Sequence, residues 1–487
     1  MNNELSSLKP EGLWRNFQKL TQIPRPSKKE EKVIRFMKEF GEGLGLKTIV
    51  DEVGNVIIKK PATPGMKNRQ GIIMQGHLDM VPQANSDRNF DFDTDPIETI
   101  IDGDWVKANG TTLGSDNGMG VAAAMAVLES KTLEHGPVEA LFTVDEETGM
   151  TGAFELKPGI LDGQILLNMD SEDEGELYVG CAGGINATST LKYDEVAPDG
   201  NVAAFKIHVS GLKGGHSGID IPLYRANANK IMFRLLKKAA NNFGLRINEL
   251  EGGSLRNAIP RESVAIVTVN KDSEKSFQQY VLDFEKTVKK EYSTADPEAK
   301  ISCTAEAIPE KVMEAAAQKK FIDAIYACPN GVVRMSSDMA GLVETSTNLA
   351  IVSIKNGEAK SLSLLRSSVD SAKHDLAETV VSVFDLAGAE TLLDGDYPGW
   401  KPNPDSAILQ AMKEIYNKKF GKVPEIKAIH AGLECGLLGG VYPHWDMISF
   451  GPTIRHPHSP DEKVNIPSVQ KFWDFLVETL KHVPVKS

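Results

Sequence analysis

Cysteine is scarce in this chain, and the few cysteines present are scattered. The 487 residues include four, Cys181, Cys303, Cys328 and Cys435, and none of them forms a CxxC pair. Such spacing is typical neither of a disulfide framework nor of a zinc site built from thiolates. We therefore expect a cytoplasmic protein, kept in a reducing compartment.

Positive charge and long apolar runs are also limited. Lysine and arginine number 54 against 67 aspartates and glutamates, which gives a formal net charge of −13. Because an acidic surface repels phosphate backbones and anionic membranes, nucleic acid is not an expected partner. No segment reaches 18 uninterrupted apolar residues, and the first residues lack the basic start and apolar stretch of a secretory signal. We expect neither a membrane span nor export.

The first part of the chain has the pattern of an α/β domain. From about 44 to 185, short β-branched runs such as NVIIKK and GIIMQG alternate with helical patterns such as NGMGVAAAMAVLES. This alternation predicts a largely parallel sheet covered by helices. A length of 487 residues, at about 100–200 residues per domain, also predicts more than one domain.

From about residue 200 the pattern changes. The stretches AAFKIHVSGL and SVAIVTVN alternate polar and apolar residues, as strands with one solvated face do, and NGEA indicates a hairpin. A linker rich in Pro, Gly and Asp at 394–405 precedes a return to the α/β style. We predict a catalytic domain in two parts, 1–198 and 397–487. An α+β domain at 199–396 is inserted between them, and the pattern leaves open an internal duplication of this inserted domain.

Residues able to bind a metal recur where the predicted strands of the first part end. They are His77 after GIIMQG, Asp116 in TTLGSDNG, Glu146 and Glu147 in DEETG, and Asp170 in NMDSEDEG. Each has an ordinary explanation by itself: a core histidine, a helix N-cap or a solvated acidic turn. Because ligands of open α/β sheets bind beyond the carboxyl ends of strands, the recurrence favours one common site.

Imidazole and carboxylate groups without thiolate are typical of a catalytic site for zinc or a related divalent metal. The tail segment GPTIRHPHSPDE adds His456 and His458. The candidate ligands are more numerous than one ion needs. We therefore predict a two-metal site in which a carboxylate bridges ions about 3.5–4 Å apart, with a hydroxide between them. Asp79, two residues after His77 in an extended chain, would accept a hydrogen bond from the second nitrogen of that imidazole.

These motifs, in this order, resemble the co-catalytic zinc exopeptidases, which include carboxypeptidase G, aminoacylases and bacterial dipeptidases. The matching stretches are GHLDMVP, TTLGSDNGMG, DEETGM, NMDSEDEGE and HPHSPDE. With GCAGG, GLKGGHSG, LRNAIPRE and HAGLECG, the chain resembles the aminoacyl-histidine (Xaa-His) dipeptidase branch over essentially its full length. The resemblance implies a phosphorylase/hydrolase-like α/β catalytic domain, with a mixed, mainly parallel sheet flanked by helices, and an inserted α+β lid domain.

The resemblance also implies two Zn²⁺ ions bridged by Asp116. Glu147 and His458 would complete one site, and His77 and Asp170 the other. The tail ligand is taken as His458, not His456, because His458 directly precedes SPDE.

Further roles come from the same resemblance. Glu146 would be the general base and acid, and His216 of the lid would stabilise the oxyanion. Asn257 and Arg366 are candidates for binding the substrate's free carboxylate. Alternatively, GLKGGHSG forms a glycine-rich hairpin with an exposed histidine, and Arg366 is a cross-strand surface charge.

The expected activity is hydrolysis of dipeptides, Xaa-His dipeptides such as β-alanyl-histidine included, by the bridging hydroxide with Glu146 as base. The alternatives are an N-acyl amino acid deacylase, a broad-specificity di/tripeptidase, and a non-catalytic protein that has kept the fold. The last is disfavoured because all five ligands and Glu146 are present. The sequence leaves open Zn²⁺, Co²⁺ or Mn²⁺ as the metal, a homodimer, and the residue preference on each side of the scissile bond.

Overall fold

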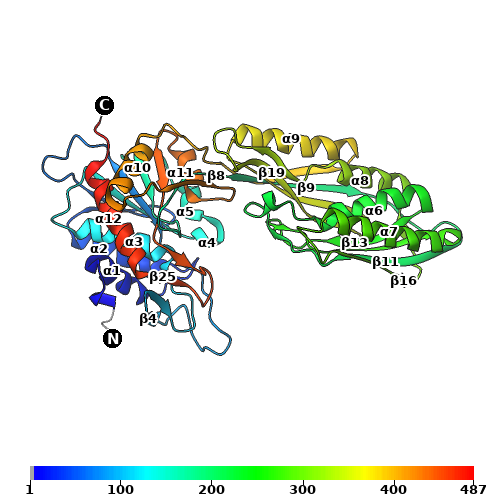
Figure 1. Ribbon diagram of the computed structural model, residues 1–487, viewed down its shortest axis with the longest axis horizontal. Coiled ribbons are helices and arrows are strands. Elements are labelled where there is room, and N and C mark those ends of the chain that lie inside the picture. Colours follow the sequence, from blue (N-terminus) through cyan, green and yellow to red (C-terminus); the bar gives the residue numbers. More distant parts are fainter. Residues whose placement is uncertain (1–4, 487) are drawn as a thin grey trace. The chain divides into compact units, whose positions relative to one another are not determined.

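The computed structural model describes residues 5–486, which form two compact units (Figure 1). The first unit comprises Met1–Gly180, Pro402–Ala428 and Leu433–Ser487, and the second comprises Cys181–Lys401 and Ile429–Gly432. An inserted second unit is thus present. It begins at Cys181 and its long segment ends at Lys401, whereas the sequence predicted residues 199–396. The reason is that the strand Gly183–Lys192 pairs inside the second unit, and Trp400 forms an isolated β-bridge with Cys181.

The central sheet of the first unit is mixed. Within the described residues it has eight strands, in the order β1-β2-β6-β3-β7-β23-β8-β22. The strands β6, β3, β7 and β23 are parallel to one another, whereas the pairs β1–β2, β2–β6 and β23–β8 are antiparallel. Parallel pairing therefore runs through the four adjacent strands β6, β3, β7 and β23. The bounds are β1 (Lys47–Val50), β2 (Val56–Lys60), β3 (Ile72–His77), β6 (Val138–Thr143), β7 (Ile165–Asn168), β8 (Glu176–Cys181), β22 (Glu425–Ile429) and β23 (Asp446–Ser449).

Helices cover this sheet, and α3 carries Asp116 in its first turn. Its sequence is rich in Ala and Gly, so its backbone packs closely on β3 and against α1. The last helix, α12, begins after Asn465, whose side chain caps the Ser468 N–H, and carries Pro467 in its first turn. The bounds are α1 (Glu11–Thr21), α2 (Glu31–Gly43), α3 (Ser115–Glu129), α4 (Glu146–Gly149), α5 (Thr151–Glu155), α10 (Ala407–Phe420), α11 (Glu434–Val441) and α12 (Ile466–His482).

A small second sheet ties the tail of the chain to its first quarter. Its order is β24-β25-β5-β4, and all its pairs are antiparallel. The loop between β24 and β25 carries His458. The bounds are β4 (Thr99–Asp102), β5 (Trp105–Ala108), β24 (Ile454–Arg455) and β25 (Lys463–Asn465).

The second unit is built on an antiparallel sheet. Among its described residues the strand order is β16-β11-β15-β13-β19-β20-β9-β21, with β18 paired to β19. The hairpin expected at NGEA is confirmed: Lys355 pairs with Glu358, and Asn356 and Gly357 both have positive φ (52° and 76°), as a two-residue hairpin turn requires. The strands are β9 (Gly183–Lys192), β11 (Val202–Ser210), β13 (Arg246–Gly252), β15 (Ser263–Asn270), β16 (Lys300–Glu306), β18 (Gly331–Met335), β19 (Val343–Lys355), β20 (Glu358–Ser367) and β21 (Glu390–Tyr397).

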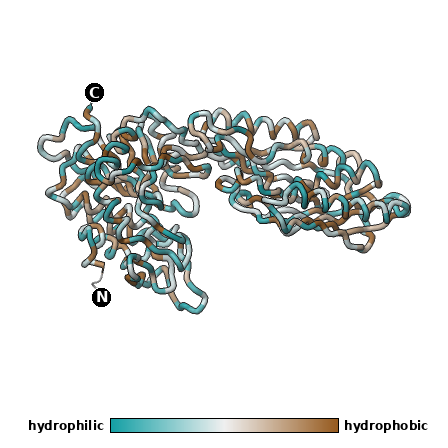
Figure 2. Tube along the Cα trace, in the orientation of Figure 1, coloured by the Kyte–Doolittle hydropathy of each residue, from teal (hydrophilic) through white to brown (hydrophobic). Residues whose placement is uncertain are grey.

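Four longer helices and two short ribbons complete this unit. One core joins the alternate strand residues to the helices, and Phe205, Phe233, Phe277, Phe321 and Phe384 are fully buried in it. Figure 2 shows the apolar residues recurring along these strands and helices. The helices are α6 (Ala228–Phe243), α7 (Glu274–Glu291), α8 (Ala315–Ala327) and α9 (Asp370–Leu386), and the ribbons pair β10 (Glu195–Val196) with β17 (Val312–Met313) and β12 (Gly215–His216) with β14 (Ala258–Ile259).

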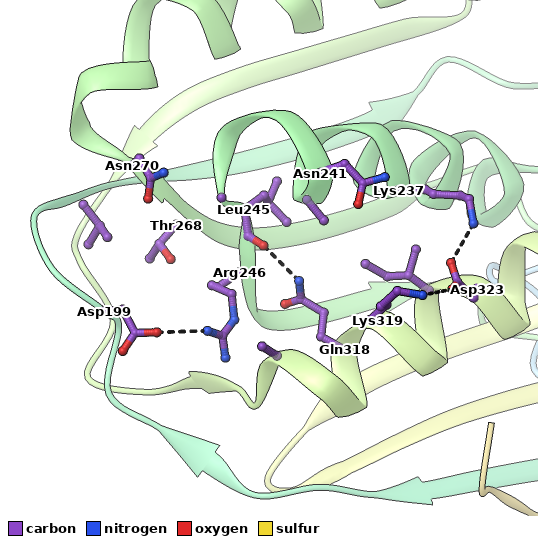
Figure 3. A pocket seen from close by; sticks show the side chains of 15 residues that line it. Asp199, Lys237, Asn241, Leu245, Arg246, Thr268, Asn270, Gln318, Lys319 and Asp323 are labelled. Atoms are coloured by element: carbon purple, nitrogen blue, oxygen red, sulfur yellow. Dashed lines mark hydrogen bonds and ion pairs between the residues drawn. The ribbon is translucent and has the colours of Figure 1, made fainter.

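A cavity of about 460 Å³ lies in the second unit beside α6, α8 and the start of β13 (Figure 3). Lys237 and Lys319 both pair with Asp323, at 2.6 and 2.8 Å, and Arg246 pairs with Asp199 at 3.3 Å. The charges of its wall are thus paired within the wall, and we assign the cavity no role.

None of the helices in residues 5–486 combines the length and apolar character needed to cross a bilayer.

Candidate metal centre

Three neighbouring parallel strands bring the candidate ligands together. His77 is the last residue of β3, Glu146 and Glu147 open α4 just after β6, and Asp170 follows β7 by two residues. The carboxyl ends of parallel strands lie at one edge of the sheet, where polar side chains can converge. Asp116 joins them from the first turn of α3, the helix that packs on β3.

Asp116 lies between two groups of ligand atoms. Its Oδ1 is 3.1 Å from Nε2 of His77, and its Oδ2 is 3.2 Å from Nε2 of His458. The first group is completed by Asp170, with Oδ1 3.4 Å from Nε2 of His77, and the second by Glu147, with Oε2 2.9 Å from Nε2 of His458. In each group one ligand atom from each residue lies within 4.8 Å of the others. One carboxylate therefore presents one oxygen to each group.

The two tail histidines have different surroundings. His458 reaches Asp116 and Glu147, whereas His456 belongs to none of the metal-binding groups found in residues 5–486. Both have positive φ, 56° and 59°, so the loop between β24 and β25 turns sharply at each. The turn at His458 directs its imidazole to the other ligands.

Asp79 lies behind His77 and is fully buried. Its Oδ1 is 3.3 Å from Nδ1 of His77, and this ring nitrogen is also 3.2 Å from the Asp79 carbonyl oxygen. The carboxylate accepts hydrogen bonds from Ser27 Oγ and from the backbone N–H groups of Glu146 and Glu147. Against the effect of burial, hydrogen bonds from His77 and Ser27 lower the pKa of Asp79 to about 2. As a carboxylate it orients both the imidazole and the turn that carries Glu146.

The other acids of the centre are close enough for their negative charges to act on one another. Burial and the charges of Asp170, Glu434 and Glu147 raise the pKa of Glu146 well above its ordinary value, although His77 opposes this. Hydrogen bonds to Asp116 and Glu147 raise the pKa of His458 to about 11. The carboxylates of the centre therefore stabilise a positive charge placed among them.

The donor atoms fit divalent cations. Oε1 of Glu147 is buried without a hydrogen-bond partner, although its other oxygen faces His458. A buried carboxylate oxygen that lacks a donor is costly unless a cation lies beside it. Histidine nitrogens and carboxylate oxygens without thiolate are also the donors that catalytic zinc and related ions prefer.

Glu462 holds the Asp116 segment in place. It is 2% exposed, and its carboxylate accepts the backbone N–H groups of Leu113, Gly114, Ser115 and Asp116 at 2.7–3.3 Å. It thus fixes the loop that carries Asp116 to the tail that carries His458. Glu462 is the last residue of the stretch HPHSPDE, so the motif includes its position. Its four N–H donors lie nearly 350 positions away, however, so the neighbouring sequence does not indicate that Glu462 binds them.

Arg25 links the same loop to the segment after His77. It is buried, and it donates to the carbonyl oxygens of Leu78, Asp79 and Gly114 at 2.5–3.0 Å. Gly114 has φ +71°, and a Cβ there would lie 2.6 Å from Nη2 of Arg25. The glycine of TLGSD is therefore required by both backbone conformation and space.

Glu434, in the stretch HAGLECG, is a further buried acid that had no assigned role. Its Oε2 accepts from Gln75 Nε2 at 2.5 Å and from Thr143 Oγ1 at 2.9 Å, whereas Oε1 has no hydrogen-bond partner. Burial raises the pKa of Glu434 to about 7, although His77, Thr143 and Gln75 oppose the change.

Glu434→Gln is expected to stabilise the metal-free protein at pH 8 and to have little effect near pH 5. A folded-state pKa of about 7 against an ordinary 4.5 means that the acid favours folding below pH 4.5, and that this contribution is lost as pH rises towards 7. The difference corresponds to about 3 kcal/mol of unfolding free energy. Urea unfolding with chelator at both pH values measures it, with Glu155→Gln on exposed α5 as control. An equal effect at both pH values would contradict this reading.

His216 occupies the ribbon β12–β14 in the second unit. Its Nδ1 accepts hydrogen bonds from the N–H groups of Gly218 and Ile219, each at 3.1 Å. The ring proton is therefore on Nε2, which is left as a donor. Burial and the charge of Arg366 lower the pKa of His216, which favours the neutral ring. The residue is half-buried, so a fully exposed hairpin is not what forms.

Arg366 and Asn257 lie in the same region of the second unit. Arg366 is only 5% exposed and donates to Tyr397 Oη at 3.0 Å and to Ser217 Oγ at 3.4 Å. Among the described residues no carboxylate pairs with it, so it is a buried cation without a counter-charge and not a surface charge. Asn257 is exposed, and its carbonyl accepts the Ser217 N–H.

The chain is similar to known peptidases over its full length. The chain is 44% identical to the cytosol non-specific dipeptidase of Escherichia coli over 99% of its own length and 100% of the relative's. It matches the crystal structure of aminoacylhistidine dipeptidase from Vibrio alginolyticus with a TM-score of 0.95 and 46% identity, covering both chains fully. A tripeptidase from Staphylococcus aureus, at 16% identity and a TM-score of 0.56 over 98% of this chain and 99% of that one, shares the fold. The model of peptidase family M20/M25/M40 matches residues 73–482, and the chain belongs to this family of peptidases.

Proposed function

We propose that the protein is a metal-dependent dipeptidase that hydrolyses the peptide bond of dipeptides, Xaa-His dipeptides such as β-alanyl-histidine among them. The observation that carries this is the position of Asp116, with one oxygen towards His77 and the other towards His458. The full-length similarity to one protein named a non-specific dipeptidase and another named an aminoacylhistidine dipeptidase supports a dipeptide substrate.

Two divalent ions, Zn²⁺ in the first instance, would be held by the two groups of ligand atoms. His77, Asp170 and Asp116 would hold one, and Glu147, His458 and Asp116 would hold the other. When bound, such ions lower the pKa of water to about 7 and polarise a carbonyl. Co²⁺ and Mn²⁺ accept the same donors.

The protein's own groups then have distinct tasks. Glu146 takes the proton from the attacking water and returns it to the leaving amine, and burial and neighbouring acids raise the pKa of its carboxyl above the ordinary value. Asp79 holds the turn that presents Glu146. The Nε2–H of His216 donates to the oxyanion, an interaction worth roughly 3–4 kcal/mol at comparable sites.

Arg366 and Asn257 are proposed to bind the substrate's terminal carboxylate. The buried guanidinium of Arg366 has only hydroxyl partners, and a carboxylate would supply the missing charge. Recognition of the terminal carboxylate at a fixed length of substrate would favour dipeptides over longer chains.

Chelation is expected to abolish hydrolysis of β-alanyl-histidine, and added Zn²⁺, Co²⁺ or Mn²⁺ to restore it. Metal analysis of the purified protein is expected to give about two ions per chain. Assays on other Xaa-His dipeptides, tripeptides and N-acetyl amino acids separate the dipeptidase from a di/tripeptidase and from a deacylase. Activity that survives complete removal of metal would contradict the proposal.

A cytoplasmic location is proposed from the cysteine pattern and from the name of the Escherichia coli relative, which includes the cytosol. The sequence leaves a homodimer open. Light scattering on the purified protein measures the mass of the assembly, and a mass of one chain would contradict the dimer.

A further inference from the structure

The buried guanidinium of Arg366 is held by two hydroxyl groups of its own unit. Its Nη1 donates to Tyr397 Oη at 3.0 Å and its Nε donates to Ser217 Oγ at 3.4 Å, whereas its Nη2 makes no hydrogen bond within residues 5–486. Since an arginine carries five N–H groups, some of them, both of Nη2 included, stay available for a carboxylate. A guanidinium binds a carboxylate best in one planar orientation, so the residue that fixes Arg366 also fixes this site.

Tyr397 reaches Arg366 across an intervening strand. In the register of the sheet, Gly184 of β9 lies opposite both Arg366 of β20 and Tyr397 of β21. A Cβ at Gly184 would lie 2.6 Å from Cε1 and from Oη of Tyr397. The phenol ring therefore passes over Gly184 to reach the guanidinium, and any larger residue at position 184 would obstruct it.

The backbone of Tyr397 is also fixed. Its carbonyl accepts a hydrogen bond at 2.5 Å from Nζ of Lys373, a fully buried lysine of α9. The same ammonium group pairs with Asp370 at 3.0 Å and with Asp396 at 2.7 Å. A Cβ at Gly183 would lie 2.4 Å from the Tyr397 carbonyl oxygen. The last two glycines of the stretch GCAGG thus lie against Tyr397, one against its carbonyl and the other against its ring.

We propose that Tyr397 is a positioning residue for the substrate's terminal carboxylate, and that it acts by holding the guanidinium of Arg366. This inference rests on the proposed dipeptidase function, in which Arg366 binds that carboxylate. A hydroxyl accepts an N–H of the guanidinium without neutralising its charge, as an aspartate or glutamate in this place would. The positive charge is therefore kept for the substrate, and its orientation is set before the substrate binds, which reduces the entropic cost of binding.

Two compounds that differ only in the terminal carboxylate test this role. They are β-alanyl-histidine and β-alanyl-histamine. Tyr397→Phe keeps the ring and removes the acceptor, so KM for β-alanyl-histidine is expected to rise about 10-fold with kcat nearly unchanged. For β-alanyl-histamine, kcat/KM is expected to be lower than for β-alanyl-histidine in the wild type and to be unaffected by the substitution. If β-alanyl-histamine is not hydrolysed, its inhibition constant gives the same comparison.

Two further variants test whether Tyr397 acts through Arg366. In an Arg366→Ala background, Tyr397→Phe is expected to have no additional effect on kcat/KM for β-alanyl-histidine, because the group that it positions is gone. Gly184→Ala places a methyl group against the ring and is expected to raise KM in the same way as Tyr397→Phe.

Tyr280→Phe is the matched control, because Tyr280 lies on α7 of the same unit and its hydroxyl makes one hydrogen bond, to the Leu235 carbonyl at 3.2 Å. This variant is expected to keep wild-type kinetics, and metal content is expected to be equal in all variants. An unchanged KM for β-alanyl-histidine in Tyr397→Phe, equal losses for the two compounds, or a full additional loss in the Arg366→Ala background would overturn the inference while leaving dipeptide hydrolysis intact. A wild-type protein that hydrolyses no dipeptide would overturn the proposed function and this inference with it.

Discussion

Glu146→Gln is expected to lower kcat by about 10²- to 10⁴-fold while metal content stays at the wild-type level. Glutamine has nearly the same shape, and it can neither accept the proton of the attacking water nor return it to the leaving amine. The backbone N–H of residue 146 would still bind Asp79, so the turn that carries Glu147 is expected to keep its place. Steady-state kinetics with β-alanyl-histidine and metal analysis of the same samples measure the effect.

Glu155→Gln is the control for this experiment. Glu155 is exposed near the end of α5 and pairs only with Lys157 at 3.4 Å, so this variant is expected to keep wild-type kinetics. Near wild-type turnover of Glu146→Gln with its metal bound would show that another group transfers the proton. Loss of metal would instead place Glu146 among the ligands.

Asp116→Ala is expected to remove both metal ions and to lower activity by more than about 10³-fold. Since each oxygen of Asp116 faces a different histidine, one truncation takes a ligand from both groups at once. Removal of His458 or of Asp170 alone is expected to affect one ion more than the other. Metal analysis after dialysis, and calorimetric titration with Zn²⁺, measure the number of ions and their affinity.

The control for Asp116→Ala is Asp102→Ala, on β4, where the aspartate is exposed and pairs with Lys107. Circular dichroism of both variants checks that the fold is kept. Two ions bound with wild-type affinity in Asp116→Ala would contradict a shared ligand. One ion retained at full strength would mean that Asp116 serves a single site.

The sequence alone determined the elements and the residue types at their ends. Alternation of apolar runs with helical patterns predicts parallel strands, and polar residues at the ends of such strands converge because these ends share one edge of the sheet. That reasoning applies to His77, Glu147 and Asp170, which the structure places around Asp116. The position of Asp79 follows from the two-residue period of an extended chain.

The tertiary structure decided what has no local pattern. The partners of Glu462 lie 346 to 349 positions away, and Gln75 meets Glu434 across 359 positions. The start of the second unit at Cys181 depends on the pairing of β9 with β20, whose partners lie 166 to 184 positions later. Periodicity is written along the chain, whereas hydrogen bonds between distant segments form only when packing has brought those segments together.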